Sequence, residues 1–86
     1  MITVAQTMRL REQLERGMVD MRLEAAGNWI ELRAVPDGIT WLATMKTSSG
    51  SSQGFCLSGG PLLFQQMTAL VSGALVWLRV NKYGFN

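Results

Sequence analysis

The chain has 86 residues, of which 48% are hydrophobic and 16% charged, with one cysteine and no histidine. This composition excludes a disordered chain, an internal disulfide and a metal site built from several cysteines. The formal net charge of +2 is also too small for a protein that neutralises many phosphates.

The N-terminal segment has the pattern of an amphipathic helix over residues 4–16. Thr3 and Gln6 have the spacing of a capping box, and Gly17 lies where such a helix would end. Arginines and glutamates at i,i+3 and i,i+4 spacing favour a salt-bridged, solvated face over a basic recognition helix. The apolar side chains are expected to gather on the other side of the helix: Val4, Met8, Leu10 and Leu14.

Three runs of alternating polar and apolar residues follow, at residues 18–24, 29–35 and 39–46. A period of two is typical of strands that have one buried face and one wet face. The runs are separated by short turn sequences at residues 25–28 and 36–38. The pattern therefore predicts an antiparallel meander.

A region rich in serine and glycine comes next. Residues 47–54 predict a flexible loop with nothing to pack against, and residues 55–57 suggest a short additional strand. Pro61 is placed to be the first residue of a second helix, since its missing amide is not needed there.

The second helix requires a choice, because residues 61–78 carry no charged side chain and approach the length of a membrane span. Their apolar side chains fill only half of a helical wheel, which favours an amphipathic helix; a membrane segment is the less favoured alternative. The helical pattern breaks at Ser72 and Gly73, and residues 74–81 then alternate like a strand. We therefore predict a short helix followed by a C-terminal strand.

These elements predict a single α+β domain over residues 1–86, in the order α-β-β-β-(β)-α-β. A small antiparallel sheet, formed by the three-stranded meander and the C-terminal strand, would carry two helices on its apolar face. Residues 82–86 would form a C-terminal tail. Because no signal peptide is recognisable, we expect a cytoplasmic protein.

The lack of histidine removes Ser-His-Asp and Cys-His catalytic pairs and most zinc sites. The glycines of residues 50–60 do not have the spacing of a phosphate-binding loop, and no lysine follows them. Cys56 lies between two apolar neighbours and is expected to be a buried, inert thiol. We therefore expect no enzymatic activity, no cofactor and no metal.

The carboxylates are expected in a turn or on solvent-facing strand positions. Asp37 belongs to the turn sequence. Asp20 and Glu24, with Glu31 or Arg33 opposite, are expected to form a charge ladder across neighbouring strands.

Two hypotheses for function remain. The favoured one is a non-enzymatic protein that contacts another protein or a second copy of itself, acting by occlusion as an adaptor or inhibitor. Its small size alone suggests a phage or mobile-element protein. Aromatic and apolar residues are enriched at interface centres, and the candidate interface comprises Trp29, Val35, Leu42, Trp77, Arg79, Lys82, Tyr83 and Phe85.

The alternative hypothesis is weak nucleic-acid binding by the C-terminal segment. Aromatic and basic residues interleave there as they do in stacking platforms for single strands. Arg79 and Lys82 are the only cations after residue 46, however, which makes this alternative the less favoured one.

Overall fold

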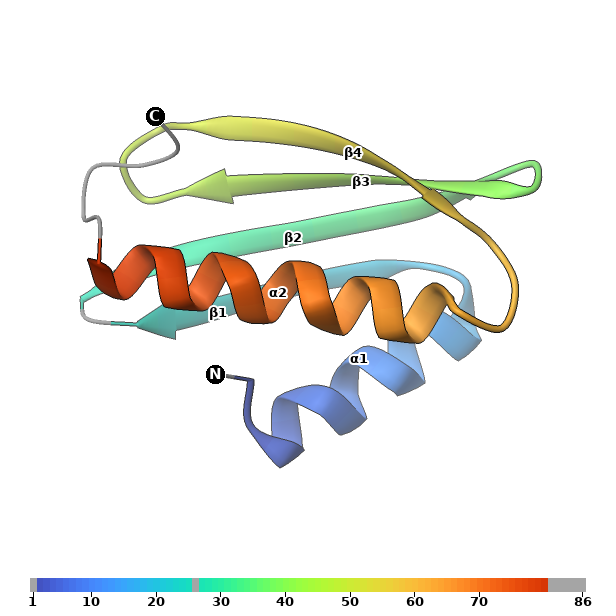
Figure 1. The fold of residues 1–86 in the computed structure, drawn as a ribbon, viewed down its shortest axis with the longest axis horizontal. Coiled ribbons are helices and arrows are strands. Elements are labelled where there is room, and N and C mark those ends of the chain that lie inside the picture. The colour runs from blue at the N-terminus through green and yellow to red at the C-terminus, as the bar shows by residue number, and fades with distance from the viewer. Residues whose placement is uncertain (1, 26, 81–86) are drawn as a thin grey trace.

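The computed structural model describes residues 2–25 and 27–80, which form an α+β fold (Figure 1). The predicted fold class is confirmed, with the elements in the order α-β-β-β-β-α. Their bounds are α1 Val4–Arg16, β1 Val19–Ala25, β2 Asn28–Asp37, β3 Thr40–Thr47, β4 Ser52–Ser58 and α2 Leu63–Val80.

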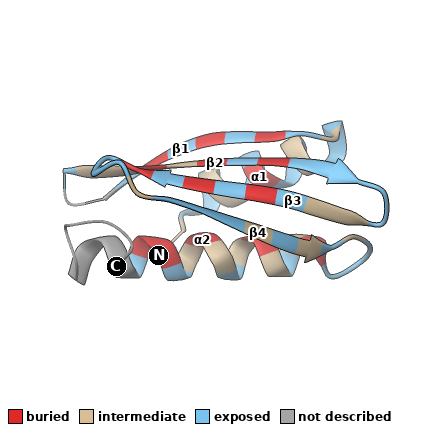
Figure 2. Ribbon diagram, turned by 90° about the horizontal axis from the view of Figure 1, so that it is seen from above, coloured by how far each residue is buried: buried red, intermediate tan, exposed pale blue. Residues whose placement is uncertain are grey.

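The four strands form one antiparallel sheet in the order β1-β2-β3-β4, so chain neighbours are also neighbours in the sheet. α2 lies across one face of this sheet, and α1 runs along the β1 edge beside α2 (Figures 1 and 2). The other face carries neither helix. The meander predicted from the alternating runs is confirmed, and the short strand suggested at residues 55–57 becomes the centre of β4.

The hairpin between β2 and β3 shows how a short turn sets the register. Asp37 pairs with Thr40, which leaves Gly38 and Ile39 as a two-residue loop. Gly38 has a φ of 62°, a left-handed conformation that glycine adopts without steric cost. Positive φ at the first loop position is typical of the turns that match strand twist. Pro36 and Asp37 belong to β2 rather than to the predicted turn.

The core lies between the sheet and the helices, where alternate strand residues meet one side of α2. Figure 2 shows the strands alternating between buried and exposed positions. Each strand therefore has one apolar side, as period two requires. The core consists of Leu10, Val19, Met21, Leu23, Ile30, Leu32, Ala34, Ala43, Met45, Leu63, Met67, Val71, Ala74 and Leu75.

α1 begins and ends as predicted. The Gln6 amide donates to the Thr3 hydroxyl over 3.1 Å, and the Thr3 amide donates to the Gln6 side chain over 2.9 Å. Both bonds of a capping box are present. Gly17 follows the helix in the left-handed conformation that commonly terminates helices.

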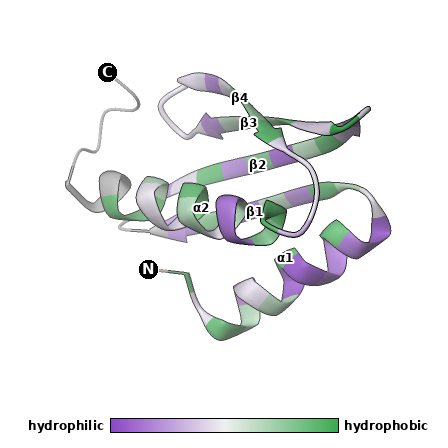
Figure 3. Cartoon of the chain, turned by 45° about the vertical axis from the view of Figure 1, so that its right-hand side comes forward, coloured by the Kyte–Doolittle hydropathy of each residue, from purple (hydrophilic) through white to green (hydrophobic). Residues whose placement is uncertain are grey.

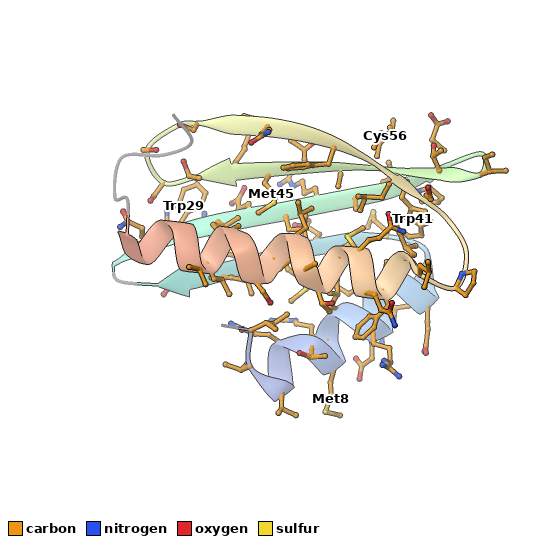
Figure 4. All side chains as sticks on the ribbon, viewed as in Figure 1. Met8, Trp29, Trp41, Met45 and Cys56 are labelled. Carbon is orange, nitrogen blue, oxygen red and sulfur yellow. The ribbon has the colours of Figure 1, made fainter. Side chains whose placement is uncertain are left out.

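The predicted inner side of α1 is wrong for two of its members. Val4 is 78% exposed, and Met8 is exposed and projects away from the body of the protein (Figure 4). Leu10 is buried and Leu14 half-buried. Because α1 lies along a sheet edge, it needs only a narrow apolar stripe, and that stripe is centred on Leu10.

The C-terminal strand predicted over residues 74–81 is wrong for residues 74–80, which continue α2. Residue 81 lies outside the described residues. Val71, Ala74 and Leu75 are all buried, a spacing that places three side chains on one side of a helix. Their burial outweighs the cost of about 1 kcal/mol for Gly73 inside a helix. Short apolar runs fit either period, so tertiary packing decided this segment.

No helix among the described residues is both long enough and apolar enough to cross a bilayer. α2 spans 18 residues, and its sequence includes the polar residues Gln65, Gln66, Thr68 and Ser72.

The loop predicted over residues 47–54 is shorter and better anchored than expected. Thr47 is buried at the end of β3, and residues 52–54 belong to β4. The Ser48 amide donates to the Trp29 carbonyl over 3.0 Å, and the Ser48 hydroxyl accepts from the Trp29 amide over 3.3 Å. The loop therefore packs against the start of β2, a contact that local sequence does not reveal.

The core assignment predicts a large difference between two leucines of the same sheet. Leu32 is fully buried, whereas Leu42 is 45% exposed. We expect Leu32→Ala to lower the free energy of unfolding by about 2–5 kcal/mol, because it leaves a cavity under α2. Leu42→Ala should cost less than about 1 kcal/mol. Urea unfolding followed by tryptophan fluorescence measures both, and equal losses would contradict the assignment of the buried face.

Candidate protein-contact surface

The sheet face turned away from α2, called the outer face below, carries the charge ladder expected from the sequence. Arg22 faces Glu31 across β1 and β2, with 2.8 Å between Nη2 and Oε1. Asp20 faces Arg33 in the next row, with 3.6 Å between Oδ1 and Nε. Lys46 of β3 is the next neighbour of Glu31. These opposite charges stabilise the pairing only modestly, because both pairs are exposed to water.

The charge ladder lowers the proton affinity of Glu31. The hydrogen bond from Arg22 is the largest cause that lowers the pKa of this carboxyl below its ordinary value of 4.5. Partial desolvation opposes the shift, while the positive charges of Arg22, Arg33 and Lys46 support it. Glu31 therefore stays ionised to lower pH than an isolated glutamate, and this part of the outer face stays electrically balanced.

Trp29 lies at the same end of the outer face, at the start of β2. The Arg22 guanidinium stands over its ring at 4.2 Å from the centroid, the arrangement of a cation–π contact. Trp29 is half-buried, and its backbone bonds to Ser48. This tryptophan is therefore already engaged within the chain.

An apolar row occupies the opposite end of the outer face. Val35 pairs with Leu42, and Leu42 pairs with Cys56, so the three side chains lie next to one another on β2, β3 and β4. Val35 is 47% exposed and Leu42 45%, and Cys56 is also exposed. These three residues are called the apolar row below.

Two further exposed apolar residues flank the apolar row. Met18 immediately precedes β1 and is exposed, and the register of β1 continues to place it opposite Val35. Ile39, in the adjacent hairpin turn, is 90% exposed. The Asp20–Arg33 row of the charge ladder adjoins this apolar end on one side, and Asp37 follows Val35 on the other.

The structure brings together only part of the predicted interface. Val35 and Leu42 are direct cross-strand partners. Trp29 lies six residues along β2 from Val35, about 20 Å at the rise of a strand, and Figure 4 places it at the other end of the sheet from Cys56. The backbone of Trp77 and Arg79 belongs to α2, and nothing is described of their side chains. The remaining candidates, Lys82, Tyr83 and Phe85, lie outside the described residues.

The prediction of a buried Cys56 is wrong, because this thiol is exposed on the outer face. Its neighbours Phe55 and Leu57 are half-buried on the opposite face, as strand alternation requires. Sequence reasoning also missed Met18 and Ile39 as parts of an exposed apolar surface. The strand register reveals the surface, because it places Met18 opposite Val35 and continues the row through Leu42 to Cys56.

Charge is segregated by the fold as well as along the chain. Residues 47–78 carry no charged side chain, and they form β4 and most of α2. Figure 3 shows hydrophilic residues concentrated on α1 and the neighbouring strands, and weakly polar or apolar ones along β4 and much of α2. The side of α2 that faces away from the core is exposed but uncharged: Gln65, Ala69, Gly73 and Val76.

A hollow of about 490 Å³ lies where the end of α1 meets the start of α2. The Arg11 guanidinium stands over the Phe64 ring there, at 4.4 Å from the centroid, and Glu15 is the other charged residue of its wall. The hollow is open to solvent and balanced in charge, and its wall contains no nucleophile. Its remaining wall residues are Leu14, Gly60, Pro61, Leu63 and Gln65.

No protein-family model matches this chain. Comparisons with curated proteins and with solved structures also give no significant similarity. The functional argument therefore depends on the chemistry and geometry of the described residues.

The pKa shift of Glu31 predicts a measurable coupling within the charge ladder. A carboxyl whose pKa is lowered by folding stabilises the folded state above its unfolded pKa and loses that contribution as pH falls through its folded pKa. We expect Glu31 to titrate below 4.5 in the native protein, measured by NMR of the side-chain carboxyl carbon. Arg22→Gln should raise that midpoint because it removes the main donor. An unchanged midpoint in the variant would contradict the proposed cause.

Proposed function

We propose that this protein acts without catalysis, by noncovalent contact between its outer face and another protein. The observation that carries the proposal is the apolar row, a group of exposed apolar side chains held in fixed register on a rigid sheet. A single exposed apolar residue needs no explanation. The apolar row, however, places three neighbouring side chains on three strands, and with Met18 and Ile39 beside it they form a patch. Such patches commonly mark interaction sites.

The chemistry of the rest of the outer face suits a protein partner. An interface usually has an apolar, water-excluding centre and a polar rim. The apolar row provides the centre, and the ladder of Arg22, Glu31 and Lys46 provides a polar margin at the other end of the sheet. Because Arg22 and Glu31 are paired with each other, the ladder contributes orientation and specificity more than affinity.

A small sheet of this kind functions by covering a surface of its partner. The exposed apolar row supports an adaptor or an inhibitor. Cytoplasmic location and a phage or mobile-element origin stay predictions, as does the absence of enzymatic activity. The nucleic-acid alternative also stays a prediction, because its residues lie where side chains are not described.

The proposal predicts that one charge placed in the apolar row abolishes binding while the fold persists. We expect Leu42→Lys to reduce recovery of bound proteins from native extract at least tenfold, as expected when a central interface residue is lost. The matched control is Thr44→Lys, which adds the same charge to the same face of β3, in the ladder row where Thr44 pairs with Arg33. Quantitative mass spectrometry of the captured proteins measures the difference.

Both variants should unfold at nearly the same urea concentration as the parent protein, because both positions are exposed. If Leu42→Lys captured the same proteins in the same amounts as Thr44→Lys, the apolar row would not be the contact surface. Loss of binding in both variants alike would also contradict the proposal, since it would indicate a response to net charge.

A further inference from the structure

The two edges of the sheet differ in how their backbone groups are satisfied. At the β1 edge, the Asp20 amide donates to the Gln13 side chain of α1 over 2.7 Å. The Met18 amide donates to the Gln13 carbonyl over 3.2 Å. α1 runs along this edge, and the strand carries Asp20, Arg22 and Glu24. Charged side chains and a covering helix are both devices that prevent a further strand from pairing.

The β4 edge can be oriented from two hydrogen bonds at its ends. The Gly59 amide donates to the Ile39 carbonyl, and the Thr47 amide donates to the Ser51 carbonyl. Both bonds fit the register that pairs β3 with β4. In an antiparallel pair, hydrogen-bonded positions alternate with positions whose backbone groups point away. Odd-numbered residues of β4 therefore bond to β3. The outward-pointing residues are Ser52, Gly54, Cys56 and Ser58.

These four residues leave the β4 edge open. Their side chains are small, uncharged and exposed, and β4 contains no proline. The Gln66 side chain donates to the Ser58 carbonyl over 3.0 Å. The outward-pointing amides of Ser52, Gly54 and Cys56 have no hydrogen-bond partner within residues 2–25 and 27–80. Among the described residues, the β4 edge therefore has no charged side chain and no helix running along it, although α2 bonds to it at Ser58 through Gln66.

We propose that β4 pairs antiparallel with β4 of a second copy of this chain, about a two-fold axis that passes close to Phe55. In that register the outward-pointing positions meet one another: Ser52 faces Ser58 of the other copy, and Gly54 faces Cys56 of the other copy. The two phenylalanines face each other at a non-hydrogen-bonded position, where cross-strand side chains lie closest.

The sequence of β4 favours its own copy over a foreign strand. Reversed, Ser-Gln-Gly-Phe-Cys-Leu-Ser keeps serine at both ends, small residues beside the centre and phenylalanine at the centre. A two-fold interface requires this kind of self-complementarity. When two identical strands pair, like charges come together and destabilise the pairing. β4 has no charged residue, so this repulsion does not arise. Phe55 is half-buried in the single chain and would gain a partner ring on the helix-covered face.

Pairing about this axis joins the two sheets into one and keeps both outer faces on the same side. Because Cys56 lies on the outer face beside the axis, the apolar rows of the two copies would meet there. The inference goes beyond the proposed function and does not rest on it, since the β4 backbone and the outer-face side chains can be changed separately.

The mass of the protein as a function of concentration tests the inference. A single strand pair is a small interface, so we expect dissociation in the micromolar range, on the order of 10–100 μM. Sedimentation equilibrium should show the mass rising from 9.5 kDa toward twice that value. Gly54→Pro removes an outward-pointing amide without touching the bonds to β3, and should weaken association at least tenfold. A strictly monomeric parent protein at 500 μM would overturn the proposal.

Gly54→Ala is the matched control for the proline variant. It keeps the amide, and its Cβ would meet the Ala43 carbonyl oxygen at 4.0 Å, an ordinary contact. We expect this variant to associate like the parent protein. Equal association of Gly54→Pro and Gly54→Ala, with the same far-ultraviolet circular dichroism, would contradict pairing through this edge.

Cysteine cross-linking of the unmodified protein provides a second test, which does not depend on whether the Gly54→Pro variant folds. In the proposed register the two Cys56 residues are diagonal neighbours, about 7–8 Å apart. A bifunctional thiol reagent with a spacer of about 8 Å should link them at concentrations where dimers form, and Cys56→Ser should abolish the product. No cross-linked dimer at 500 μM would count against the register.

The variants also separate this inference from the proposed function. Leu42→Lys should lose its protein partner and still dimerise. If instead Leu42→Lys became monomeric while Gly54→Pro dimerised normally, the copies would associate through their apolar rows, and pairing through β4 would be wrong.

Discussion

The structure depends on the burial of one face of the sheet beneath α2. Side chains alternate along each strand, so a shift of one residue in any strand would move its whole apolar set into water. The buried members of β2, Ile30, Leu32 and Ala34, are covered on one side only. The same alternation turns Val35 outward next to buried Ala34. The apolar row is thus a direct consequence of the register that forms the core.

The difference between the two edges of the sheet results from the helices that precede β1 and follow β4. α1 precedes β1, covers its edge and bonds to it through Gln13. β4 leads into α2, which crosses the sheet face and bonds to the β4 edge at Ser58. The first half of the chain therefore supplies the protected edge together with most of the charge. The second half supplies an uncharged strand and an uncharged helix side, both suited to contacts between macromolecules.

Much of the fold was predictable because it depends on local signals. The capping box at Thr3 and Gln6, the termination at Gly17 and the period of the meander were all correct. The cross-strand charge ladder was correct for Asp20 and Arg33, whereas Glu24 lies opposite Trp29 and Glu31 pairs with Arg22. The errors lie where local patterns are ambiguous. Residues 74–80 fit a strand or a helix equally well, and the burial of Ala74 and Leu75 decided for the helix.

By itself the sequence determined α1, the three-stranded meander with its wet face and the absence of imidazole chemistry, since these depend on residue types and on spacing along the chain. Only the tertiary structure decided that Val35, Leu42 and Cys56 are neighbours while Trp29 lies far away. It also decided that Cys56 is exposed and that β4 forms an open edge. These properties depend on strand order and on which edge a helix covers, and both result from long-range packing that no local pattern encodes.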